Sequence, residues 1–198
     1  MKSPIVSEVT QHLDDLAATA RRVADELAGE IAEVADLVLH ALDGGRKLLF
    51  CGNGGSAADA QHLATEYVVR FARERRPFPA IALTTDTSLL TAAANDLGFE
   101  QVFARQIRAL GGAGDVAFLH STSGESENLL EAARAAREVG VKTVALLGRG
   151  GGRLREAVDV ALVVPTDNVA RAQELHLAIG HAICGVVEAR LAGAGGGV

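Results

Sequence analysis

The sequence predicts an α/β fold: a three-layer α/β/α sandwich with a five-stranded parallel sheet and a long N-terminal helix. Two observations predict this fold class. Short apolar runs alternate with segments of helical periodicity along most of the chain. The apolar runs show almost no polar alternation, which is typical of parallel strands that helices cover on both faces.

The chain begins with a long helical pattern. Apolar residues recur every three or four positions from Val9 to Leu42, and the sequence Asp-Gly-Gly at 43–45 ends the pattern. One small domain cannot cover a helix over about 5–43 along its whole length. We therefore interpret it as an oligomerisation helix, with a helix lying across its own domain as the alternative.

Strands and helices alternate after this helix. Strands are predicted at residues 47–51, 80–84, 116–120, 143–147 and 160–164. Helices are predicted near 57–73, 99–110, 126–139 and 153–157, with a final one over about 170–192. Because no linker or internal repeat divides the chain, residues 1–198 are interpreted as one domain, with the sandwich over about 46–192.

Composition excludes several classes of protein. The 198 residues are 48% hydrophobic and 22% charged, with a formal charge of −6 and no basic stripe, which argues against a nucleic-acid binder. Cys51 and Cys184 lie in apolar runs and are interpreted as reduced core residues. No apolar stretch approaches the roughly 18 residues of a membrane span, so we expect a soluble cytoplasmic protein without a membrane partner.

The loop Ser-Thr-Ser-Gly-Glu-Ser at 121–126 has the features of a phosphate site. Ser121, Thr122, Ser123 and Ser126 can each donate a hydroxyl proton, and the loop opens onto a helix whose first N–H groups attract anions. In a parallel sheet, ligands bind beyond the carboxyl ends of the strands, where this loop lies. The alternative is that Ser126 serves only as a helix N-cap.

The loop Gly-Asn-Gly-Gly-Ser at 52–56 is a weaker signal. It is not a dinucleotide fingerprint, because position 57 is Ala, and no phosphate-binding lysine follows it. Asn53 and Ser56 could hydrogen-bond a ligand that approaches the glycine backbone. A plain tight turn explains the glycines about as well.

Two predicted helices have polar faces. His62 and Glu66 lie four residues apart on one helix, and Gln173 and His181 share a side of the last helix two turns apart, whereas His176 points elsewhere. Together the four residues could form a zinc site or an acid–base pair. Their spacing leaves open whether the two helices meet.

Four motifs resemble one known family. "GNGGSAADAQHLATE", "TTDTSLLTAAANDLGF", "STSGES" and "QELHLAIGH" are similar, in this order, to the phosphoheptose isomerases of the sugar isomerase (SIS) fold, over about residues 9–191. The resemblance implies a homotetramer with sites between subunits. It also implies an aldose–ketose isomerase that converts D-sedoheptulose 7-phosphate to D-glycero-D-manno-heptose 7-phosphate through an enediol, towards the heptose of lipopolysaccharide or another glycoconjugate.

The resemblance also implies a role for each matching residue. The sugar-phosphate pocket would be lined by Asn53, Gly54, Gly55 and Ser56, the phosphate held by Ser121, Thr122, Ser123 and Ser126, and the sugar chain contacted by Asn95, Asp96, Glu66 and Gln173. The zinc ligands, for one ion per subunit, would be His62, Glu66, Gln173 and His181, with Glu66 and His181 as the acid–base pair. A glutamate bound to a metal is a poorer base, so either the metal contact loosens during turnover or the zinc has a partly structural role.

One departure from the family pattern and two alternatives remain. Glu125 places a carboxylate beside the predicted phosphate, and we expect its side chain to face solvent. A non-catalytic SIS protein that binds a replication initiator would keep the sheet and loops without needing all four polar residues. An isomerase of another sugar phosphate would share the same loops.

Overall fold

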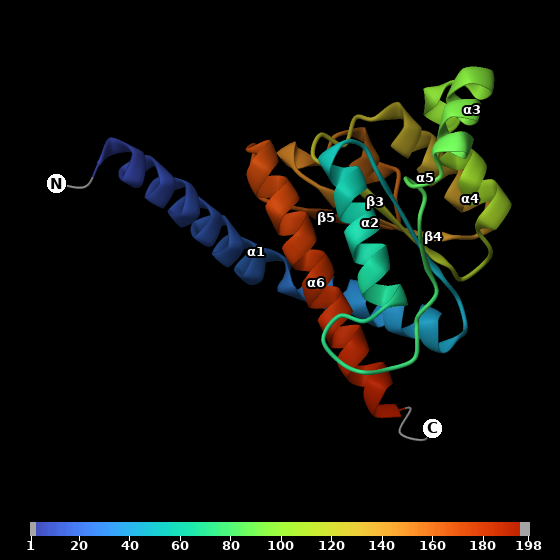
Figure 1. Ribbon diagram of the computed structural model, residues 1–198, viewed down its shortest axis with the longest axis horizontal. Coiled ribbons are helices and arrows are strands. Elements are labelled where there is room, and N and C mark those ends of the chain that lie inside the picture. The colour runs from blue at the N-terminus through green and yellow to red at the C-terminus, as the bar shows by residue number, and fades with distance from the viewer. Residues whose placement is uncertain (1–2, 195–198) are drawn as a thin grey trace.

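A parallel sheet forms the centre of the computed structural model, which describes residues 3–194 (Figure 1). Its five strands run in the order β2-β1-β3-β4-β5. Their bounds are Leu48–Gly52 for β1, Ala80–Ala82 for β2, Val116–Ser121 for β3, Lys142–Leu147 for β4 and Val160–Val163 for β5. The predicted fold class is confirmed, and the two edge strands are shorter than predicted.

Six α-helices surround the sheet in the described residues (Figure 1). Their bounds are Pro4–Asp43 for α1, Gly55–Val68 for α2, Thr87–Leu97 for α3, Ala104–Leu110 for α4, Glu127–Val139 for α5 and Val169–Ala194 for α6. Short 3-10 turns occur at Phe99–Gln101, Arg149–Gly151 and Arg153–Glu156. The 3-10 turn at Arg153–Glu156 takes the place of the helix predicted over 153–157.

The region between β2 and β3 differs most from the prediction. The helix expected over 99–110 is confirmed only in its second part, as α4, because a 3-10 turn occupies its first part. The sequence analysis also missed α3, whose N-terminus is capped by Asp86 accepting a 2.9 Å bond from the Leu89 N–H. Ala93 is the only fully buried residue of α3, but Leu89, Leu90 and Ala94 pack partly buried against the second core, so the helix has an apolar stripe that the sequence analysis overlooked.

The two faces of the sheet pack against different helices. Leu48 and Phe50 of β1 join a core with α1, α2 and α6. Leu49 and Cys51, which alternate with them, join a second core with α4 and α5. Both cysteines are buried and free, as predicted.

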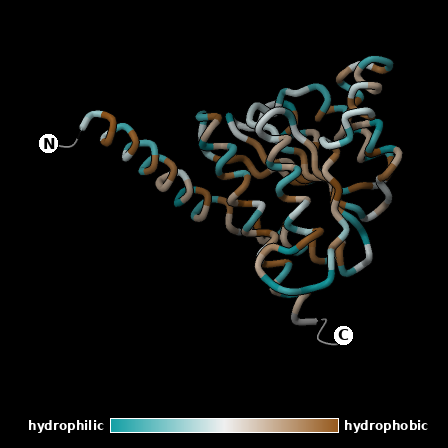
Figure 2. Tube along the Cα trace, in the orientation of Figure 1, coloured by the Kyte–Doolittle hydropathy of each residue, from teal (hydrophilic) through white to brown (hydrophobic). Residues whose placement is uncertain are grey.

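Helix α1 extends beyond the body of the molecule (Figures 1 and 2). Its second half is anchored by buried residues from Val23 to Leu42. Its first half leaves Ile5, Val9 and Leu13 exposed. The long helix is thus confirmed, and much of its apolar surface near the N-terminus has no partner within the described part of the chain.

Helix α6 corrects one expectation about hydropathy. Residues Val169–Ala192 are long and apolar enough to cross a membrane by length and composition. The sequence analysis found no apolar stretch of this length because Gln173, His176 and His181 interrupt it. In the structure 44% of this segment is buried. Helix α6 packs against both α1 and α2, so it is a core helix of the fold.

Candidate functional site

The strand order places the candidate site at the boundary between β1 and β3. The chain leaves β1 towards β2 on one side and returns to β3 on the other, so the loops after β1 and β3 diverge there and leave a crevice. Asn53 of the loop after β1 and Asn128 in the first turn of α5 bridge this crevice through two reciprocal amide hydrogen bonds of 2.9 and 2.8 Å. Sequence reasoning missed Asn128, although it lies only two residues after Ser126.

An open cavity of about 380 Å³ lies beside this bridge. It is lined by Asn53, Phe99, Glu100, Ser126, Glu127 and Asn128. Phe99 and Glu100 were not predicted as site residues, since the turn that holds them follows the helix that the sequence analysis missed. The cavity brings predicted residues from two loops, Asn53 and Ser126, to one place.

The phosphate-binding loop predicted at 121–126 is a compact turn. The Ser121 Oγ accepts the Gly124 N–H at 2.9 Å, and the Ser123 Oγ accepts the Glu125 N–H at 3.2 Å. Ser126 occupies the N-cap position of α5, yet its side chain makes no capping bond. The alternative role of Ser126 as a plain cap is therefore not supported, and Ser126 is one of the residues that line the cavity.

Glycine is required at the centre of this loop. Gly124 has φ +67°, and a Cβ there would lie 1.8 Å from the carbonyl oxygen of Gly151 in the turn after β4. The next 3-10 turn, Arg153–Glu156, holds Glu125 away from the loop interior. The Arg153 Nε donates to the Glu125 carboxylate at 2.8 Å and its main-chain N–H at 3.0 Å, which lowers the pKa of that exposed carboxyl group. Glu125 faces solvent, as predicted.

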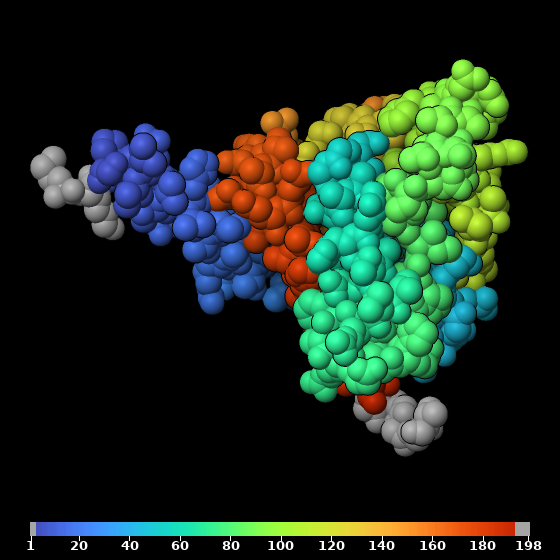
Figure 3. Space-filling model, viewed as in Figure 1, coloured from blue at the N-terminus to red at the C-terminus, as the bar shows by residue number. Residues whose placement is uncertain are grey.

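Helices α2 and α6 lie side by side and meet through three predicted residues (Figure 3). We call His62, Glu66 and His181 the α2/α6 triad. The His62 Nε2 lies 2.8 Å from the His181 Nε2 and 3.2 Å from the Glu66 Oε1. One ligand atom from each residue lies within 4.8 Å of the other two, so the structure answers the question of whether the helices meet.

The electrostatics of the α2/α6 triad favour a neutral His181. Burial lowers its pKa, the neighbouring His62 lowers it further, and Glu66 opposes the shift. A neutral imidazole can coordinate a metal ion or accept a proton. The ring of Phe71, from the loop after α2, packs against the His181 ring with centroids 5.2 Å apart and so helps to fix its orientation.

Gln173, the fourth predicted zinc ligand, lies at the other end of the helix pair. A Cβ at residue 55 would lie 2.1 Å from the Gln173 Nε2, so this side chain rests against Gly55 at the start of α2. His181 is eight residues further along α6, about 12 Å at 1.5 Å per residue. The structure thus places Gln173 beside the predicted sugar pocket, and its role as a zinc ligand stays a prediction.

The remaining predicted residues lie around the same loops. Gly54 has φ +57°, and Ser56 is buried in the first turn of α2. Asn95 donates a 2.7 Å bond to Asp96 near the end of α3, where both are exposed. Neither of these two residues lines the cavity beside Asn53, so their contact with a sugar chain stays a prediction.

Comparison with known proteins agrees with this architecture. The SIS domain family matches residues 11–148. The phosphoheptose isomerase of Geotalea uraniireducens is 54% identical over 96% of this chain and 100% of its own length, and that of Geobacter sulfurreducens is 51% identical over 94% and 99%.

Solved structures show the same similarity. The phosphoheptose isomerase of Neisseria gonorrhoeae is 42% identical, with a TM-score of 0.88 over 93% of this chain and 99% of that one. The Francisella tularensis phosphoheptose isomerase is 37% identical, with a TM-score of 0.90 over 94% and 100%. The chain therefore belongs to the SIS domain family and, within it, to the phosphoheptose isomerases, which are sugar-phosphate isomerases.

Proposed function

We propose that this chain converts D-sedoheptulose 7-phosphate to D-glycero-D-manno-heptose 7-phosphate through an enediol. The observation that supports this most is the meeting of Glu66, His62 and His181 between α2 and α6. A carboxylate and two imidazoles are the groups that proton transfer between neighbouring carbons requires. The relatives named phosphoheptose isomerase support the choice of sugar.

The separation between the two parts of the site fits a long sugar phosphate. The predicted phosphate loop lies beside the start of α2, and His62 lies seven residues after Gly55, roughly 10 Å along the helix. In an extended heptose 7-phosphate, the phosphate and the reacting C1 and C2 atoms lie at opposite ends. With its phosphate at Ser121–Ser126, such a substrate reaches the α2/α6 triad with its carbonyl end.

The reaction divides between Glu66 and His181 in this proposal. Glu66 removes a proton from C1 of the ketose, and the resulting enediol is protonated at C2 to give the aldose. His181, kept neutral by burial, moves the proton between the two sugar oxygens. Gln173 and Asn53 orient the chain of hydroxyl groups through their amides.

Zinc is a further part of the proposal. The 2.8 and 3.2 Å separations within the α2/α6 triad are close to the ~3.3 Å that separates ligands of a tetrahedral zinc with bonds of about 2.0–2.1 Å. Two imidazoles and a carboxylate also form a suitable donor set. The residues therefore fit one zinc per subunit, which would polarise the sugar carbonyl when bound.

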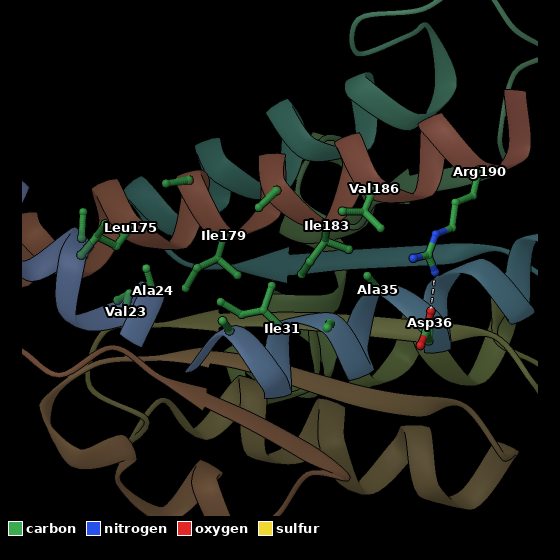
Figure 4. Close-up of a pocket in the computed structure, with 15 residues that line it drawn as sticks. Val23, Ala24, Ile31, Ala35, Asp36, Leu175, Ile179, Ile183, Val186 and Arg190 are labelled. Atoms are coloured by element: carbon green, nitrogen blue, oxygen red, sulfur yellow. Dashed lines mark hydrogen bonds and ion pairs between the residues drawn. The ribbon is translucent and has the colours of Figure 1, made fainter. Parts of the chain in front are cut away.

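Assembly into a homotetramer belongs to the same proposal. An apolar groove of about 450 Å³ runs between α1 and α6, where Ile31, Leu175, Ile179 and Ile183 face one another (Figure 4). The Arg190–Asp36 ion pair of 3.1 Å lies at one end (Figure 4).

Open apolar surfaces of this kind are typical of subunit contacts. The side chain of His62 is 46% exposed, so a second subunit would also shield the reacting end of the site from water.

We place the enzyme in the cytoplasm, at the first step towards the heptose of lipopolysaccharide or a related glycoconjugate. The two buried cysteines that remain free support a reducing compartment. The family relationship supports the heptose product. The destination of that product is also inferred from the family, without support from the site.

A substrate panel tests the proposed function. Purified protein is incubated with sedoheptulose 7-phosphate, with unphosphorylated sedoheptulose and with shorter ketose phosphates, and aldose formation is followed for wild type, Glu66→Gln and His181→Ala. We expect the heptose phosphate to react fastest and each variant to lose at least about 10²-fold, the usual scale for acid–base groups. Full activity in a variant would remove that residue from the mechanism. No turnover by wild type of any sugar phosphate would support the non-catalytic alternative.

A further inference from the structure

A second group of metal-binding side chains lies beneath the predicted phosphate loop. Asp59 of α2, His120 of β3 and His176 of α6 each offer one ligand atom, and these atoms all lie within 4.8 Å of one another. We call them the inner cluster. Both histidines are fully buried, with 0% exposure, while Asp59 is half-buried, so an ion would enter from the Asp59 side.

The polar atoms of the inner cluster are unpaired. Neither ring nitrogen of His120 or His176 has a hydrogen-bond partner in the described part of the chain, nor has the buried Oδ2 of Asp59. Such atoms are almost always paired in folded proteins, since leaving them unpaired is costly. Three unpaired side chains that point towards one another therefore indicate a ligand that all of them share.

The protonation states suit a cation. Burial lowers the pKa of His120 to about 3, with a further contribution from His176, and burial lowers the pKa of His176 to about 4. The Leu147 main chain opposes the second shift without meeting hydrogen-bond geometry. At neutral pH both imidazoles are therefore uncharged, the form in which histidine coordinates metal ions.

We propose that the inner cluster is a second divalent-cation site, for which zinc is the best match. Two imidazole nitrogens and one carboxylate oxygen are donors that zinc prefers, and one ion between them would hold all three. Nothing in this proposal depends on the isomerase reaction or on zinc in the α2/α6 triad.

The position of the inner cluster gives the ion a structural role. His120 immediately precedes Ser121 of the phosphate loop, Asp59 lies one turn before His62 on α2, and His176 lies between Gln173 and His181 on α6. An ion bound there joins the base of the phosphate loop to both helices of the α2/α6 triad. It would hold the two ends of the site at a fixed separation.

Zinc stoichiometry tests the site in a protein that lacks the α2/α6 triad. The His62→Ala/His181→Ala variant is equilibrated with zinc, dialysed and analysed by elemental mass spectrometry. We expect one zinc per chain, and none after His120→Leu is added to the same background. The proposal is overturned if the double variant retains no zinc, or if it keeps its zinc after His120→Leu.

Cobalt provides a readout that needs no change in the buried histidines. Titration of the His62→Ala/His181→Ala variant with cobalt should produce visible absorption of tetrahedral intensity, which zinc displaces. Asp59→Asn should weaken this binding by at least about tenfold. Chelation should also lower the melting temperature of the double variant, because the ion binds only the folded state. An absent cobalt spectrum together with an unchanged melting temperature contradicts the proposal.

Discussion

At the residue scale, Gly55 and Gln173 couple the two helices at the predicted sugar pocket. Gly55→Ala would push the flexible end of the Gln173 side chain out of its position, because the new Cβ would lie 2.1 Å from the amide nitrogen. We expect kcat/KM to fall by about tenfold or more, since small misplacements in a site are costly, with little change in stability.

The Gly55→Ala/Gln173→Ala double variant separates this explanation from others. Because both single changes remove the same contact, their effects on kcat/KM should not add. Gly29→Ala is a matched control, since Gly29 is exposed in α1 with no atom near its Cβ position. Additive losses would show that Gly55 acts through something other than Gln173.

The sequence predicted individual residues only where their spacing is local. His62 and Glu66 share one helix face by their four-residue spacing, so their proximity was predictable. The reciprocal bonds between Asn53 and Asn128 join residues 75 positions apart, and the sequence around neither residue indicates the pair. The position of Gln173 beside Gly55 was unpredictable for the same reason.

At the element scale, Glu188 of α6 anchors the loop that follows α2. Its carboxylate accepts the N–H groups of Phe71, Ala72 and Arg73 at 2.8–3.0 Å and pairs with the Arg75 Nε at 3.1 Å. Arg75 in turn donates a 2.7 Å bond to the carbonyl of Glu66. The predicted helix over 57–73 ends at Val68 because this loop finds its partners on α6 instead.

Glu188→Gln should destabilise the protein by about 3–5 kcal/mol, the usual cost of leaving one buried charge of a pair uncompensated. Both partners are buried, with side chains 2% exposed. Urea unfolding monitored by circular dichroism measures the effect. Glu138→Gln is a control, since its pair with Arg108 is exposed and should contribute less than about 1 kcal/mol.

The contribution of Glu188 should also depend on pH in a definite direction. Burial raises the pKa of its carboxyl group, but the main-chain N–H groups of 71–73 and Arg75 outweigh burial and lower the pKa below 4.5. The stabilisation is therefore fully present above pH 4.5 and is lost as the pH falls through the folded pKa. The difference in unfolding free energy between wild type and Glu188→Gln should be constant from pH 7 to pH 5 and shrink below. A constant difference down to pH 3 would contradict this account.

Helices and strands were predictable where the burial of one face gives their apolar residues a regular spacing. The five strands and α1, α2, α5 and α6 bury an apolar face or are buried throughout. Helix α3 fully buries only Ala93, yet the stripe of Leu89, Leu90, Ala93 and Ala94 and the Asp86 cap were signals from which it could have been predicted.

At the scale of the whole molecule, the groove between α1 and α6 should control assembly. Ala24→Glu places a charge among the apolar side chains of this groove, near Ile31 and Ile179 (Figure 4). We expect a lower oligomeric state by light scattering and, with it, a loss of activity. Ala109→Glu, at an exposed site on α4, is the matched control and should leave the assembly unchanged. An oligomeric state unchanged by Ala24→Glu would exclude this groove from the subunit contacts.

The overall architecture was predictable because a parallel sheet covered by helices on both faces has wholly apolar strands, which alternate with helical segments in the sequence. The placement of α2 relative to α6 was not predictable from the sequence, although the α2/α6 triad depends on it. Contacts such as that of Leu63 with Gly180 set this placement. The spacing of residues along the sequence does not reveal contacts of this kind.

The most direct test of the central claim is the reaction in deuterated water, followed by NMR. If Glu66 and His181 transfer protons through an enediol, wild-type protein should form an aldose that carries deuterium at C2, and Glu66→Gln should form it at least about 10²-fold more slowly. An undiminished rate of aldose formation in Glu66→Gln would contradict the account.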